Sequence, residues 1–186
     1  MVSITALWMP ILLSAVAVFI VSSLSHMVLQ LHKKDYKGLA NEDEAMAALR
    51  NAGVQPGNTY VFPYCADMKE MGSPEMVAKM NQGPVGFMNI MPNGPMNMGK
   101  HLGQWFVYCV VVGIFVAYLA GHTLSAGADY LSVFRVAGTT ALMAYFLAEP
   151  VSSIWKAQPW GTTARHMIDG LAYSLVTAGV FGWLWP

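Results

Sequence analysis

Four side chains of the types that bind metal ions or carry protons lie inside or beside apolar stretches of the chain: His26, Glu149, His166 and Asp169. Imidazole nitrogens and carboxylate oxygens bind transition metals, and histidines also relay protons near neutral pH. Ionisable residues are costly within a membrane, so they usually face the interior of the protein or a cavity and mark function. The alternative is that all four are interfacial residues at helix ends, hydrogen-bonded to water and to one another.

Four long apolar runs position these residues: 6–31, 102–121, 130–149 and 165–185. A helix needs about 20 residues to cross the hydrocarbon core, where its backbone must satisfy its own hydrogen bonds. Only 11% of the 186 residues are charged, against about 25% in soluble domains. The sequence therefore predicts an all-α membrane protein, a four-transmembrane-helix bundle embedded in a lipid bilayer.

Residues 32–101 form the one long polar connection, for which we expect a small α+β region. Asn41 is a typical N-cap for a helix over 42–52, and Ser73 followed by Pro74 begins a second helix. The stretches 59–63 and 85–91 have the composition of short strands, which would pair as a hairpin.

The basic residues predict an orientation. Seven of the ten Lys and Arg residues lie in 32–101, Lys156 lies between the third and fourth runs, and Arg165 is the first residue of the fourth. The connection 122–129 and both terminal tails have none, and Arg135 lies within the third run. Basic residues favour the cytoplasmic side, so we expect a multi-pass protein of the bacterial inner (cytoplasmic) membrane with both termini outside and 32–101 cytoplasmic.

This topology places His26, Glu149, His166 and Asp169 at a similar depth, towards the cytoplasmic side, where they would form a metal or proton site. A haem with His26 and His166 as axial ligands is an alternative, although no second histidine pair supports it. Copper(I) held by methionines of residues 32–101 is another, although methionine is also a common gap filler in apolar surfaces. The sequence does not identify a cofactor.

Small residues recur at four-residue spacing in the expected second and fourth helices. Such stripes let helix backbones approach closely in lipid, either within one bundle or between subunits. The residues of these stripes are Gly113, Ala117 and Gly121, and Gly170, Ser174, Ala178 and Gly182.

Three stretches, LANEDE (39–44), YVFP (60–63) and GPVGF (83–87), resemble a family of small, uncharacterised bacterial membrane proteins. The resemblance implies the same layout of one anchor, a polar loop and three further spans. It implies no activity.

No nucleophile elbow, P-loop or dinucleotide fingerprint occurs, and the zero net charge does not favour nucleic acid as a partner. We therefore expect a non-catalytic accessory or structural subunit of a larger membrane complex, such as a respiratory or photosynthetic complex, with other membrane subunits as partners. The alternative is a small oligomeric transporter, or a metal- or proton-handling protein that uses the His/Glu/Asp cluster.

Overall fold

The computed structural model describes residues 1–186, which are mostly helical (65%) with one small two-stranded sheet. The chain forms two units. The helical unit comprises residues 1–36, 97–153 and 158–186, and the loop unit comprises residues 37–96 with 154–157.

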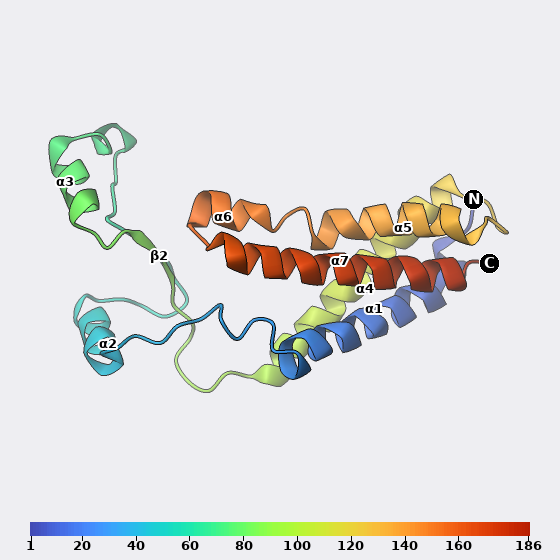
Figure 1. Cartoon of the computed structure of the whole chain (residues 1–186), viewed down its shortest axis with the longest axis horizontal. Coiled ribbons are helices and arrows are strands. Elements are labelled where there is room, and N and C mark those ends of the chain that lie inside the picture. The colour runs from blue at the N-terminus through green and yellow to red at the C-terminus, as the bar shows by residue number, and fades with distance from the viewer. The chain divides into compact units, whose positions relative to one another are not determined.

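The helical unit is built from α1 (Trp8–Ser23), α4 (Met98–Thr123), α5 (Tyr130–Tyr145) and α7 (Trp160–Trp183). Helix α1 is extended at its start by a 3-10 turn, Ile4–Leu7, and at its end by a π-helical turn, Leu24–Val28. Helix α5 packs along α7, and α1 contacts both α4 and α7. The chain runs along this unit four times, and its two termini lie at the same end (Figure 1).

Three helical stretches are long and apolar enough to cross a membrane: Ile4–Val28, Met98–Thr123 and Tyr130–Lys156. The third includes the turn after α5 and the short helix α6 (Pro150–Lys156), which the sequence analysis did not foresee. Between 22% and 33% of the residues in the apolar windows of these stretches are buried. Most of their apolar side chains therefore face outward, as they do in helices surrounded by lipid.

The predicted fourth span is not among these stretches. Helix α7 has 24 residues and begins at Trp160, five residues before the expected start. It falls short in apolar character because its first turns carry polar side chains, and several of these are buried, including Thr163 and Asp169. The sequence analysis treated the run as another apolar helix, whereas α7 contributes much of the polar interior of the unit.

The interior of the helical unit joins small apolar residues to buried hydroxyl groups. Val116, Ala137 and Phe181 are fully buried. The polar residues Ser174 and Thr177 are also buried, with exposed fractions of at most 2%. Trp105 turns inward and donates a hydrogen bond from Nε1 to Ser22 Oγ at 3.0 Å.

The small-residue stripes lie at helix contacts within the unit. A Cβ added at Gly170 would overlap the carbonyl group of Tyr145, so α7 approaches the end of α5 at its backbone. A Cβ at Gly121 would lie 2.5 Å from the carbonyl oxygen of Val2. The Val2 N–H also donates a hydrogen bond to the Gly121 carbonyl at 2.8 Å. Within this chain the stripes therefore serve intramolecular packing. The other stripe residues that are buried are Gly113, Ala117, Ser174 and Ala178.

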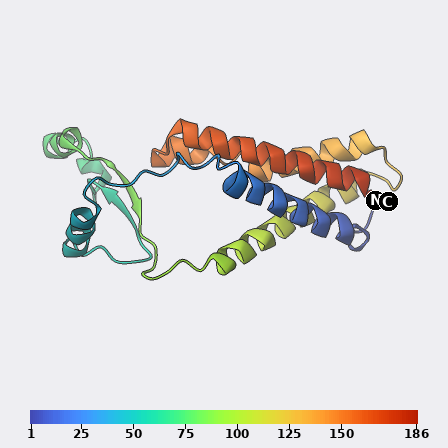
Figure 2. The same cartoon turned by 60° about the horizontal axis from the view of Figure 1, so that its bottom comes forward.

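The loop unit contains α2 (Glu42–Asn51), β1 (Thr59–Phe62), α3 (Pro74–Gln82) and β2 (Gly86–Asn89). The two strands pair antiparallel, with Thr59 opposite Asn89, which confirms the expected hairpin (Figure 2). Ser73 caps α3 by accepting the N–H of Met76 at 3.2 Å, as expected. Asn41 does not cap α2, because its amide nitrogen donates to Glu44 at 3.3 Å instead.

Candidate functional site

The site is formed where the chain leaves the first apolar helix and turns back towards α7. Helical structure ends at Val28, so His32 lies beyond the helix and not within it. Gln30 adopts a positive φ of 49°, a left-handed conformation that changes the direction of the chain. The Asp35 N–H then donates to the His32 carbonyl at 3.0 Å in a turn. These turns carry His32 and Asp35 to the side of α7.

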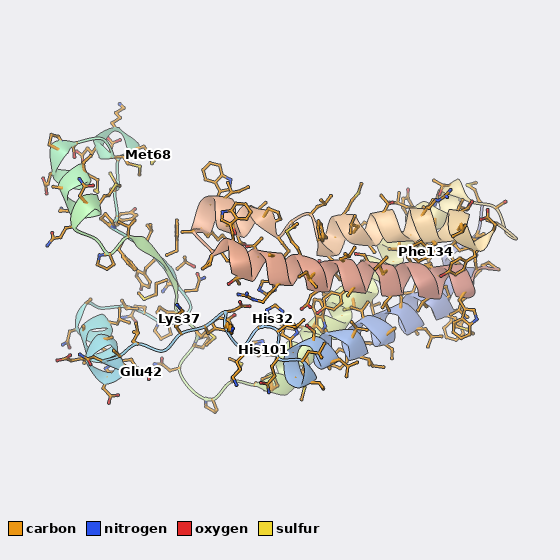
Figure 3. All side chains as sticks on the ribbon, viewed as in Figure 1. His32, Lys37, Glu42, Met68, His101 and Phe134 are labelled. Atoms are coloured by element: carbon orange, nitrogen blue, oxygen red, sulfur yellow. The ribbon has the colours of Figure 1, made fainter.

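His32 lies between two buried carboxylates that come from different parts of the chain. Its Nδ1 atom lies 2.6 Å from Oδ2 of Asp35, and its Nε2 atom lies 2.9 Å from Oδ2 of Asp169 on α7. The exposed fractions of the three side chains are 10% for His32, 2% for Asp35 and 7% for Asp169. Figure 3 labels His32 and also His101, near the start of α4.

Two more imidazoles flank His32, one on each side. The His26 ring stacks on the His32 ring at a centroid distance of 4.4 Å and an interplanar angle of 12°. The His166 ring lies at 4.6 Å from the His32 ring and is tilted by 31°. His26 Nδ1 lies 3.0 Å from the Ser22 carbonyl oxygen and 3.8 Å from Asp169 Oδ2. Three histidines therefore converge at one point.

Arg165 holds Asp35 in place. Its guanidinium donates to Asp35 Oδ1 through Nε at 2.7 Å and also through a close contact from Nη2, and Thr162 donates to the same oxygen at 3.1 Å. Burial by itself raises the pKa of Asp35, but the hydrogen bonds from Arg165, His32 and Thr162 outweigh it and lower the pKa to about 2. Asp35 is therefore an anion at neutral pH.

Asp169 is oriented by hydroxyl groups from two helical segments. Ser25 Oγ donates to Oδ1 of Asp169 at 2.7 Å, and the Tyr173 hydroxyl donates to Oδ2 at 3.3 Å. Both contacts are buried. With His32 on Oδ2 as well, this carboxylate has one defined orientation.

The arrangement has a direct chemical consequence for His32. Ionised carboxylates only accept hydrogen bonds, and a neutral imidazole has a single N–H. If His32 donates Nδ1–H to Asp35, its Nε2 lone pair faces an oxygen of Asp169 at 2.9 Å. Two lone pairs do not face each other at this distance without an electrophile between them, and a metal ion bound by His32 Nε2 and the Asp169 carboxylate is one that these residues could hold.

The nitrogen and oxygen atoms of the cluster are spaced closely enough to bind one ion. In each of two overlapping groups the ligand atoms all lie within 4.8 Å of one another. The first group is His26, His32 and Asp169, and the second is His32, Asp35 and His166.

Three of the four predicted site residues, His26, His166 and Asp169, meet in this cluster. Glu149 is outside it and lines a cleft of about 700 Å³ in the same helical unit. The sequence analysis missed His32, Asp35 and Arg165. The signal that was available is the local pattern His32-x-x-Asp35, which follows His26 by six residues.

No protein-family model, curated protein or solved structure matches this chain.

The contact between Asp35 and Arg165 predicts a large effect of single substitutions at this pair. Arg165→Gln should lower the free energy of unfolding by about 1–3 kcal/mol, because it leaves a buried carboxylate without its ion pair. Adding Asp35→Asn to Arg165→Gln should restore part of the loss. Thermal unfolding of the purified protein in mild detergent measures both effects.

The same pair predicts a pH dependence. The pKa of Asp35 is about 2 in the folded protein and about 3.9 in an unfolded chain. Its contribution to stability is therefore complete above about pH 4 and is lost as the pH falls towards 2. Equal unfolding temperatures for the wild type and Arg165→Gln at neutral pH would contradict this account of the pair.

Proposed function

We propose that this protein is an integral membrane protein that holds one divalent transition-metal ion between His26, His32 and Asp169. The observation that carries the proposal is the 2.9 Å approach of His32 Nε2 to Asp169 Oδ2, while His32 Nδ1 is held by Asp35. It is a metal-handling role, one of the alternatives that the sequence left open.

The donor set supports a transition metal over calcium or magnesium. Two imidazoles and one carboxylate suit zinc or iron(II), whereas calcium and magnesium prefer oxygen ligands alone. Histidines that bind metals usually donate their second N–H to a carboxylate, which fixes the tautomer. Asp35 has this relation to His32, and Arg165 orients Asp35 in turn.

Three protein ligands leave at least one coordination position for water or another ligand. The exposed fraction of the His26 side chain is 48%, so the site is accessible from one side. His26, His166 and Asp169 also line the cleft that contains Glu149. An ion bound here would exchange with solvent or with a molecule in the cleft.

Metal analysis of the purified protein tests the proposal. We expect about one equivalent of zinc or iron per chain, and a loss of at least tenfold in metal affinity for His32→Ala and Asp169→Asn, because each removes a ligand. His122→Ala is the matched control, since His122 is exposed and bonded only to the Tyr118 carbonyl in its own helix. Metal-free wild-type protein that binds no added zinc or iron(II) would overturn the metal site.

We also propose that α7 crosses the membrane as a fourth span, with both termini outside and residues 32–101 in the bacterial cytoplasm. The length of α7, its packing along α5 and the position of both termini at one end of the helical unit support four crossings. The basic residues concentrated in 32–101 support the orientation.

Cysteine labelling tests this topology. Cys65 lies in the loop unit, whereas Cys109 is buried. In intact bacterial cells, a membrane-impermeant maleimide should leave Cys65 unmodified and should modify Pro186→Cys in a Cys65→Ser background. Inverted vesicles should give the reverse pattern. Labelling of Pro186→Cys from the cytoplasmic side alone would show that α7 does not cross.

A role as an accessory subunit of a larger membrane complex is a second candidate, supported by the loop unit. Met76 is the one buried apolar residue between Lys37 and Met96, while Tyr64 and Met68 are more than 70% exposed. A unit with so small a core would gain stability from docking on another subunit.

The native size of the protein tests the second candidate. After mild solubilisation of the source membrane, a native gel should show the chain in a band larger than its own monomer and dimer. Migration as a free monomer or homodimer alone would exclude a stable complex.

A further inference from the structure

The cleft beside the cluster has the properties of a binding site for a membrane-soluble small molecule. It has a volume of about 700 Å³ and is bounded by residues of α1, α4, α5 and α7. Small-molecule sites are typically about 300–1,000 Å³, with apolar walls and a few polar groups that orient the ligand. All the lining residues belong to the helical unit.

One wall of the cleft is a continuous group of aromatic rings. Trp105 contacts Tyr108, Tyr145 and Tyr173 at centroid distances of 5.6, 6.3 and 5.7 Å. Tyr145 and Tyr173 meet edge to face at 5.7 Å. Rings in this arrangement present faces and edges that favour offset or edge-to-face contact with another aromatic ring.

Two of the polar residues that line the cleft are carboxylates, which only accept hydrogen bonds when ionised. The carboxylates of Glu149 and Asp169 line it, together with imidazoles, and no Lys or Arg does. A phosphate or carboxylate head group beside Glu149 would meet a like charge with no Lys or Arg lining the cleft to pair with it. Glu149 is half-buried and takes no part in the hydrogen bonds that hold Asp169. It is therefore available to a donor on the ligand.

We propose that this cleft binds a membrane-soluble hydroquinone, with a ring hydroxyl donating to Glu149 and the ring against the Trp105 wall. An apolar tail would leave the cleft along the exposed apolar surface of the helices. The oxidised quinone carries carbonyl acceptors in place of hydroxyl donors, so the carboxylate favours the reduced form. The inference does not need the metal ion, because neither Glu149 nor Trp105 is among the residues proposed to hold it.

Equilibrium binding to the full-length protein in nanodiscs tests this inference. The probes are a decyl-substituted hydroquinone, the corresponding quinone and decyl phosphate, each measured before and after treatment with a chelator. We expect the hydroquinone to bind at least tenfold more tightly than the other two, with or without chelator. Glu149→Gln should reduce the preference for hydroquinone over quinone several-fold.

A pair of bulky substitutions on α4 locates the binding. Leu102 lines the cleft, whereas Val107 does not and is 61% exposed. Leu102→Trp should abolish hydroquinone binding, and Val107→Trp should leave it unchanged. Equal binding of all three probes, or unchanged binding in Leu102→Trp, would overturn the inference. If the protein binds hydroquinone after chelation but binds no zinc or iron, the metal site is excluded and the hydroquinone site is retained.

Discussion

The helical unit depends on one interaction, the imidazole of His32 held between the buried carboxylates of Asp35 and Asp169. This interaction joins the segment that follows the first apolar helix to α7, more than 130 residues later in the chain. Buried carboxylates are costly unless they are paired and hydrogen-bonded. Arg165, Ser25 and Tyr173 supply those partners, so the cluster is both a structural tie and a site with a defined shape.

The polar character of α7 links the architecture to the chemistry. A helix surrounded by lipid can bury polar side chains only against other helices or in a cavity. Thr163, Asp169 and Thr177 are buried on α7, while the other long helices expose apolar side chains. The features that make α7 less apolar than the other helices are therefore those that place a carboxylate inside the unit, next to three imidazoles and an open cleft.

Hydropathy predicted three of the four apolar spans, and local signals predicted the small hairpin and the start of α3, because these features depend on residues close together in sequence. The Ser73-Pro74 helix start is an example. The site was only partly predictable. The predicted topology placed His26, His166 and Asp169 at one depth, but the inclusion of His32 depends on a left-handed turn at Gln30 that has no clear signature. Glu149 was grouped with them by depth alone, and depth does not determine which helix face a residue occupies.

The most direct test of the metal site is the position of the ion itself. Crystals of the full-length protein loaded with zinc, measured at the zinc absorption edge, would give an anomalous difference peak. We expect a peak about 2.0–2.2 Å from His32 Nε2 and from an oxygen of Asp169, the usual bond lengths for these ligands. A peak at the cysteine and methionines of residues 32–101, or no peak near His32, would contradict it.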